Sequence, residues 1–470
     1  MNAVDLAFTP ALELANLIRH KVISPLELTK LYLERIERLN PILGSYFTVM
    51  AEQAIAAATH QTDCLAQSSA DLPPFFGVPI AIKDLNSVGG VPCSYGIAAA
   101  RKRIAEKDDP LVARIREAGF NILGKTATPQ LGSFPYTESP GFPPARNPWN
   151  LGYTPGGSSG GASSALAAGL CAIAQASDGG GSIRGPAFCC SLVGLKPSRG
   201  RISFAPVGER LEGMATNGPL GRTVADTAAL LDVMSGYVVG DPYWLPDPPV
   251  SFLTTTQTDP AALKIGMLTE LSPIGSAHEA CAQAVKQTAQ HLEALGHKVE
   301  PATLPDLTDF IEPFTVAWQC VVAESNIPFF VLERMNRWLL WRAWRVGSGA
   351  YLRAITRLQV VSRRIVEHLQ PYDILLLPVY MHPPIRVHDW QSLRCPTILE
   401  NIIHWIAPCP PFNASGQPAI AIPTGFTDEG LPVGIQLVGR PAADSTVLAL
   451  AAQLERAHPW HQLRPKMACE

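Results

Sequence analysis

Residues 154–189 read TPGGSSGGASSALAAGLCAIAQASDGGGSIRGPAFC, in which two Gly/Ser clusters flank an apolar run of small residues. The run at 162–176 carries no charged residue. It is shorter than the ~18 apolar residues that a membrane-spanning helix needs. We therefore expect a helix buried in a protein core at 162–176, with the glycine clusters as loops at its two ends.

Outward from this segment, strand-like apolar runs alternate with helical patterns. Ser24-Pro25-Leu26-Glu27 is a typical helix start, and 110–126 combines a helix, a glycine stop and a short strand. The alternation predicts an α/β fold in which helices cover both faces of a mixed central β-sheet. We expect strands at 75–85, 191–197, 263–268, 372–379, 418–425 and 433–439, and helices within 9–60, 223–236, 277–296, 308–369 and 446–457.

No linker divides the 470 residues cleanly, so we predict a single domain spanning 1–470. Its expected parts are an N-terminal helical region (about 1–70), a catalytic core (about 71–240), a helical insertion (about 308–369) and a return to the core (about 370–460). The insertion contains Trp318, Trp338, Trp341 and Trp344. The segment 326–347 either packs the insertion onto the core or forms an apolar rim over a substrate pocket, and the sequence leaves both interpretations open.

Composition and charge exclude several classes of protein. The formal net charge of −3 provides no broad positive field for nucleic acid or an anionic membrane. The N-terminus lacks the basic start and apolar run of a signal peptide, so we expect a cytoplasmic protein. Its ten cysteines are scattered, several of them in apolar surroundings, and we expect buried free thiols there. His458 and His461 have no obvious third ligand beside them, and we predict no metal and no cofactor.

Two motifs match well-known patterns but lack the required context. GFNILGKT at 119–126 has the spacing of a phosphate-binding loop, yet a helix precedes its first glycine and its middle residues resemble a strand. GGSSG at 156–160 has the spacing of a nucleophile elbow, yet no strand leads into it. We interpret the first motif as the end of a helix followed by a strand. For the second motif a Ser-His-Asp site is the less favoured interpretation, in which His382 or His404 would supply the histidine.

Three segments together indicate hydrolytic chemistry: IKD at 82–84, PGGSSGG at 155–161 and SDGGGSIRGPA at 177–187. Lys83 follows an apolar run, and burial lowers the pKa of a lysine until its neutral amine can act as a base. A serine hydroxyl needs such a base before it can attack. Consecutive glycines allow several N–H groups to converge on a developing oxyanion.

With GVPIAIKDL at 77–85, GKTATPQLG at 124–132, GLKPSRGRIS at 194–203 and FNASGQPAIAIPTG at 412–425, the sequence strongly resembles the amidase signature family over nearly the whole chain. The resemblance implies an amidase that hydrolyses carboxylic amides through a serine acyl-enzyme. Lys83 matches the base, Ser158 the bridging serine that follows a cis peptide bond in the family, and Ser182 the nucleophile.

The resemblance also implies the surroundings of these residues. The N–H groups of Gly179, Gly180, Gly181 and Ser182 match an oxyanion hole, and Gly132 lies where the family's substrate-contacting loop passes. Asp178, Arg184 and Ser159 match supporting residues.

Five positions depart from the family pattern, and none removes a catalytic group. Ser177 replaces threonine, Ala176 and Cys190 replace glycine, Gly179 replaces a larger side chain, and Gly185 is small where the family is often larger.

The expected substrate is a small aliphatic or aryl amide. The glutaminase subunit of a tRNA-dependent amidotransferase shares the same motifs and is the alternative, followed by a catalytically silent scaffold. Neither the need for partner subunits nor homodimerisation can be decided from the sequence, and no feature indicates membrane contact.

Overall fold

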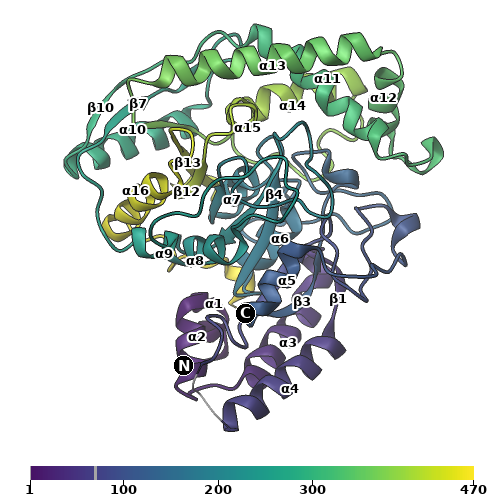
Figure 1. Cartoon of the computed structure of the whole chain (residues 1–470), viewed down its shortest axis with the longest axis vertical. Helices are drawn as coiled ribbons and strands as arrows, with labels where there is room; N and C mark the ends of the chain where they lie inside the picture. Colours follow the sequence, from purple (N-terminus) through teal and green to yellow (C-terminus); the bar gives the residue numbers. More distant parts are fainter. Residues whose placement is uncertain (1, 68–70, 470) are drawn as a thin grey trace.

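The computed structural model describes residues 2–67 and 71–469 and contains one large mixed sheet (Figure 1). The strands are β1 (Tyr46–Val49), β2 (Pro79–Lys83), β3 (Asn121–Thr126), β4 (Ile173–Asp178), β5 (Val193–Lys196), β6 (Thr216–Gly221), β7 (Lys264–Met267), β8 (Glu270–Leu271), β9 (Gly275–Ser276), β10 (Lys298–Pro301), β11 (Ile374–Pro378), β12 (Ala419–Phe426) and β13 (Pro432–Gly439). Eleven strands form the sheet in the order β1-β3-β2-β4-β6-β5-β12-β13-β11-β7-β10, and β8 pairs with β9 separately.

Helices cover both faces of this sheet, as the sequence predicts. Successive side chains of a strand point to opposite faces. Strands β2, β3, β5, β6, β11 and β13 are buried at every position, so neither face meets solvent there. Parallel pairs (β2 with β3 and β4) and antiparallel pairs (β4 with β6) occur side by side, which confirms the mixed α/β class.

The described residues form sixteen α-helices. They are α1 (Ala3–Phe8), α2 (Ala11–Arg19), α3 (Pro25–Leu43), α4 (Ala51–Gln67), α5 (Pro110–Glu117), α6 (Gly160–Ala167), α7 (Arg184–Cys190), α8 (Val224–Met234), α9 (Phe252–Thr255), α10 (Glu279–Ala294), α11 (Thr308–Glu324), α12 (Arg334–Ala343), α13 (Ser348–Leu369), α14 (Cys395–Ile406), α15 (Pro410–Ala414) and α16 (Asp444–Ala457). Helices α1–α4 lie at one end of the molecule and α11–α13 at the other (Figure 1).

The start of α3 has the capping box that its sequence predicts. The hydroxyl of Ser24 accepts a hydrogen bond from the N–H of Glu27, and the Glu27 carboxylate accepts one from the N–H of Ser24. Both orphan donors of the first turn are thereby satisfied, and Pro25 occupies the position where its missing N–H costs nothing.

The single helix expected at 162–176 is wrong in its second half. Helix α6 ends at Ala167, Gly169 adopts a left-handed conformation with φ of +65°, and 173–178 is strand β4. Both halves are apolar and fully enclosed, and periodicity cannot distinguish a buried helix from a buried strand in so short a run. The correction matters because the second glycine cluster follows the carboxyl end of β4, which is a central strand of the sheet.

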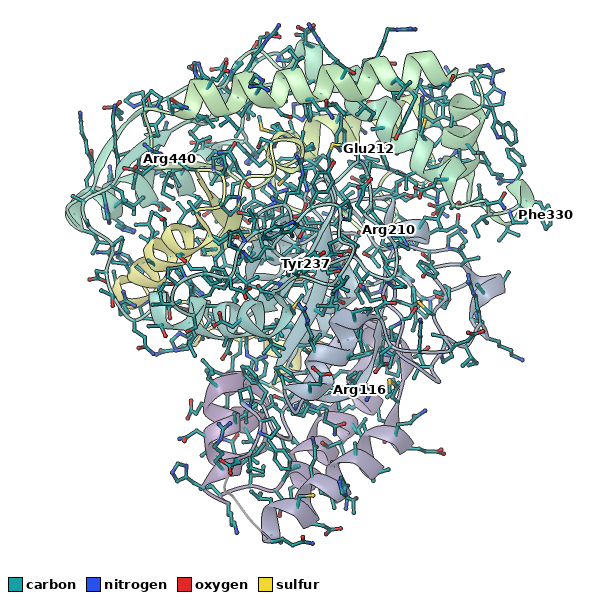
Figure 2. The ribbon with its side chains drawn as sticks, in the orientation of Figure 1. Arg116, Arg210, Glu212, Tyr237, Phe330 and Arg440 are labelled. Carbon is teal, nitrogen blue, oxygen red and sulfur yellow. The ribbon has the colours of Figure 1, made fainter. Side chains whose placement is uncertain are left out.

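The insertion region forms α11, α12 and α13, and its tryptophans lie in different environments. Trp341 on α12 is 45% exposed, and Trp344, just after α12, is 64% exposed. Phe330, just before α12, is 82% exposed at the margin of the molecule (Figure 2). Trp318 on α11 instead faces an internal cavity. The segment 326–347 therefore packs on the core through buried aliphatic residues such as Met335, Leu339 and Leu340, while most of its aromatic side chains are exposed. None of its described residues lines that cavity.

No helix in the described ranges, 2–67 and 71–469, is both long and apolar enough to span a bilayer.

Candidate active site

Strands β2 and β4 place Lys83 and the second glycine cluster next to each other. They are parallel neighbours, with Ile80 opposite Ile173, so their carboxyl ends meet at the same edge of the sheet. Lys83 is the last residue of β2, and the glycine cluster follows the last residue of β4 directly. The loop that precedes α6 supplies the serine pair at the same edge.

Lys83 is fully buried, and its amine contacts three serines. Nζ lies 2.8 Å from Oγ of Ser158, 2.8 Å from Oγ of Ser159 and 3.0 Å from Oγ of Ser177. Burial lowers the pKa of Lys83 from 10.5 to about 7, although the nearby Asp178 carboxylate acts in the opposite direction. A substantial fraction of the amine is therefore neutral near pH 7, and any of the three hydroxyls can donate to it.

The serine pair is held by a tight turn. The Gly157–Ser158 peptide bond is cis, as the family resemblance implies. Gly157 tolerates no side chain, because a Cβ there would lie 2.5 Å from the N atom of Tyr136. Ser159 also donates to the carbonyl of Ser177 at 3.2 Å. Both serines therefore contact Lys83, and Ser159 is also fixed against β4.

Ser182 stands at the end of the glycine cluster, partly exposed in the same cavity as Ser158. Gly181 has a φ of +118°, which only glycine adopts readily. The N–H of Gly181 donates to the Asp178 carboxylate at 2.6 Å. In the described part of the chain, no hydrogen bond engages the N–H groups of Gly179, Gly180 and Ser182. These three remain available to a ligand.

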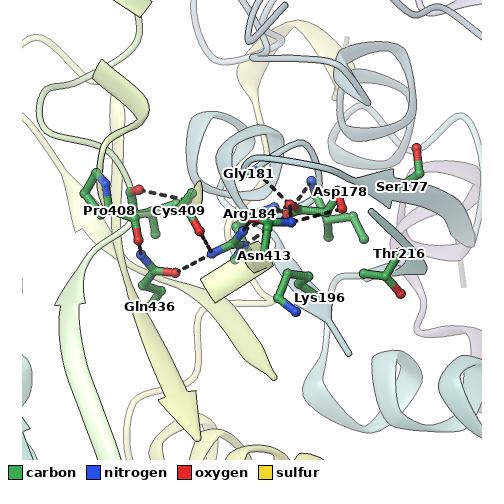
Figure 3. A network of polar contacts seen from close by, with 12 residues as sticks. Ser177, Asp178, Gly181, Arg184, Lys196, Thr216, Pro408, Cys409, Asn413 and Gln436 are labelled. Atoms are coloured by element: carbon green, nitrogen blue, oxygen red, sulfur yellow. Dashed lines mark hydrogen bonds and ion pairs between the residues drawn. The ribbon is translucent and has the colours of Figure 1, made fainter. Parts of the chain in front are cut away.

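Asp178 and Arg184 form a fully buried ion pair beneath the loop (Figure 3). Nε and Nη2 of Arg184 each donate to a different carboxylate oxygen at 3.0 Å, a bidentate pairing. Burial would raise the pKa of Asp178, but Arg184, the amide of Asn413 and the N–H of Gly181 hold it well below its usual range. A fixed negative charge thus orients the loop from below.

The rest of the Arg184 guanidinium is bound by residues from the C-terminal part of the chain (Figure 3). Nη1 donates to the carbonyl of Cys409 at 3.1 Å and to Oε1 of Gln436 at 3.0 Å, and Nη2 donates to Oδ1 of Asn413 at 2.6 Å. Asn413 also donates to Asp178, at 2.9 Å. The loop therefore depends on α15 and β13 as well as on its own neighbours.

The GKT segment is a strand, as interpreted from its context. Gly119 follows α5 with a φ of +92°, and 121–126 is β3. Lys125 is fully buried and forms an ion pair with Asp84 at 2.9 Å. The lysine of the phosphate-loop pattern is thus paired with a carboxylate inside the core.

The site opens into a cavity of about 470 Å³. Ser158, Ser182, Gly132, Gly179 and Gly180 line it on one side. Gly132 lies beside the serine pair, because a Cβ there would be 3.4 Å from Oγ of Ser158. Apolar side chains provide much of the remaining lining, from Leu131, Phe134, Leu211, Phe314, Trp318, Ile402 and Ile406, and the charged Asp109, Arg210 and Glu324 also line the cavity. None of the described residues that line this cavity is a histidine.

Sequence reasoning missed several residues that support the site. Gln175 accepts a hydrogen bond from the backbone N–H of Lys83 at 3.0 Å and donates to Asn217. A buried glutamine inside an apolar run is the signal that could have indicated it. Asn413 lies within the matched segment 412–425 but received no role, and Phe314 carries no sequence signal.

Comparison with known proteins identifies the family. The family model "Amidase" matches residues 27–448. A Synechocystis sp. protein named "Putative amidase" is 52% identical over 98% of this chain and 90% of its own length. The solved structure of 6-aminohexanoate cyclic dimer hydrolase complexed with substrate is 31% identical, with a TM-score of 0.92 over 98% of this chain and 99% of that one. A bacterial aryl acylamidase of the amidase signature family is 25% identical, with a TM-score of 0.87 over 97% of each chain.

The family match extends over most of the chain, and these relatives cover nearly all of it. The chain therefore belongs to the amidase signature family of amide-hydrolysing enzymes.

Proposed function

We propose that this enzyme hydrolyses carboxylic amides with Lys83 as base, Ser158 as proton relay and Ser182 as nucleophile. The observation that carries the proposal is the buried amine of Lys83, 2.8 Å from Ser158 Oγ, in a site where Ser158 and Ser182 line one cavity. A partly neutral amine can accept the Ser158 proton while Ser158 takes the proton of Ser182.

The chemistry then proceeds in two stages. Oγ of Ser182 attacks the amide carbonyl, and Ser158 returns the proton to the leaving amine as the C–N bond breaks. Water attacks the resulting ester and gives one proton to Lys83 through Ser158. That proton returns to Oγ of Ser182 as the acyl C–O bond breaks, which releases the carboxylic acid and regenerates the enzyme. An ester that resembles the acyl-enzyme should therefore also be hydrolysed.

We assign the oxyanion hole to the N–H groups of Gly179, Gly180 and Ser182. The N–H of Gly181 is committed to Asp178, so its contribution is to hold the loop in shape. Donors fixed before the reaction stabilise the developing oxyanion without reorganisation, and each typically contributes about 2.7–4 kcal/mol.

Covalent labelling with a fluorophosphonate probe tests the nucleophile. The wild-type chain should be labelled at Ser182, and Ser182→Ala should lose labelling and amidase activity together. Ser133→Ala is the matched control, because Ser133 lines the same cavity and has no part in the proposed chemistry. Labelling of Ser182→Ala at another serine would refute the assignment.

We propose broad specificity for aliphatic or aryl amides, because apolar side chains provide much of the cavity lining. A panel of short aliphatic amides, anilides and glutamine, given to the purified chain alone, separates this proposal from the glutaminase alternative. Turnover of anilides without partner subunits supports the stand-alone amidase. Activity confined to glutamine supports the amidotransferase role.

We further propose a single domain with a helical insertion, acting in the cytoplasm. One continuous sheet from β1 to β10 supports the first point. Homodimer formation is tested by light scattering of the purified chain.

A further inference from the structure

A second, smaller cavity lies directly behind the wall of the active site. It measures about 40 Å³, and Phe314, Trp318, Ile402 and Ile406 separate it from the active-site cavity because they line both. Thr315 is its one hydroxyl-bearing residue among those described, and its hydroxyl is committed to the carbonyl of Ile311 at 2.8 Å. With no free polar group to hold water, this space suits hydrocarbon.

Phe314 is the residue of this wall that contacts the oxyanion loop. A Cβ placed on Gly180 would lie 3.2 Å from Cζ of Phe314, so the edge of the ring reaches the oxyanion loop. On its other side Phe314 packs against Phe310, with ring centroids 5.5 Å apart. The ring thus lies between the carbonyl position at the glycine loop and the apolar cavity behind it.

We propose that Phe314 sets the length of acyl chain that the enzyme accepts, because its ring closes the active-site cavity off from the apolar cavity behind it. This rests on the proposed function, in which the acyl group is attached to Ser182. An acyl chain that leaves the carbonyl beside Gly180 meets the Phe314 ring after a few carbons. Removing the ring joins the two cavities into one apolar channel.

The experiment compares kcat/KM for a series of straight-chain acyl p-nitroanilides, from acetyl to decanoyl, in wild type and Phe314→Ala. Each methylene buried in an apolar site is worth about fourfold in affinity. In wild type kcat/KM should rise by about that factor per carbon and then fall when the chain reaches Phe314. In Phe314→Ala the maximum should move to chains longer by several carbons.

Phe310→Ala is the matched control, because Phe310 lines the second cavity but not the active-site cavity. It should leave the preferred chain length unchanged. Phe314→Leu, a milder substitution, keeps the test usable if the alanine variant does not fold, and its maximum should lie between the other two.

An unchanged maximum in a folded, active Phe314 variant, or an equal change in Phe310→Ala, overturns the inference and leaves the proposed nucleophile intact. Loss of the nucleophile assignment would show separately, as fluorophosphonate labelling away from Ser182.

Discussion

The pH dependence of amide hydrolysis should follow the burial of Lys83. Burial lowers the pKa of Lys83 from 10.5 to about 7, and only its neutral amine can accept the serine proton. Below its pKa, the neutral fraction falls about tenfold per pH unit, to roughly one tenth at pH 6 and one hundredth at pH 5. The value of kcat/KM should therefore rise tenfold per unit up to about pH 7 and level off above it.

The assay is kcat/KM for one anilide between pH 5 and pH 9 at constant ionic strength. Lys83→Ala should reduce kcat/KM by roughly 10²–10⁴-fold, the usual contribution of a general base, and should remove the inflection near pH 7.

Lys196 provides a stringent control. It is also fully buried, burial likewise lowers its pKa to about 7, and its Nζ donates to the carbonyl of Pro197 at 2.9 Å, away from the serines. Lys196→Met should keep the inflection. A flat wild-type profile, or an inflection that disappears in Lys196→Met and not in Lys83→Ala, would refute the assignment of the base.

Two further predictions concern the support of the site. Asp178→Asn should lower the free energy of unfolding by about 3–5 kcal/mol in urea denaturation, because it leaves the buried Arg184 guanidinium without its counter-charge. Arg116→Ala, which breaks a partly exposed ion pair, should lower the free energy of unfolding by less than about 1 kcal/mol. Similar losses of stability in Asp178→Asn and Arg116→Ala would contradict the reasoning. Gly185→Ala should cost about 1–3 kcal/mol in stability, because its Cβ would lie 1.8 Å from the hydroxyl oxygen of Tyr380. The same change should cost much less in a Tyr380→Leu background, and equal costs would rule out the steric explanation.

The sequence predicts the parts of the site that are local and chemically distinctive. Lys83 ends a continuous apolar run, and the Ser158 and Ser182 loops combine glycine and serine in ways that few loops require. The strands at 75–85, 372–379, 418–425 and 433–439 were also predictable, because uninterrupted apolar runs are typical of strands that are covered on both faces.

Other elements could not be predicted because tertiary contacts override their local preferences. Strand β6, TNGPLG, contains a proline and two glycines, yet it is buried at every position between β4 and β5. Strand β5 pairs with β6 only at Leu220 and Gly221, so the ladder on that side ends before Pro219. The proline and the glycines would exclude this segment from a strand prediction, and only its pairing with β4 and β5 accounts for its strand conformation.

Contacts between distant segments account for the other features that the sequence did not indicate. Gln436 contacts Arg184 from 252 positions away, and neither residue's local sequence reveals the other. The small Gly185 is explained only by Tyr380, whose ring fills the space where a side chain would stand. Two of the aromatic residues that line the active-site cavity, Phe314 and Trp318, come from α11, and the aromatic residues concentrated in 326–347 lie largely on the surface.

The dependence of the nucleophile loop on the C-terminal part of the chain has a consequence for biosynthesis. The base, the relay and the nucleophile all lie between residues 83 and 182, but the Arg184 acceptors on Asn413 and Gln436 are translated much later. At about 5–20 residues per second, roughly 10–50 s separate the synthesis of Ser182 from that of Gln436. During that time Arg184 lacks partners that it has in the finished fold. An unfinished chain on the ribosome therefore carries its nucleophile on a loop without its final support, and the enzyme becomes competent only when nearly all of it has been made.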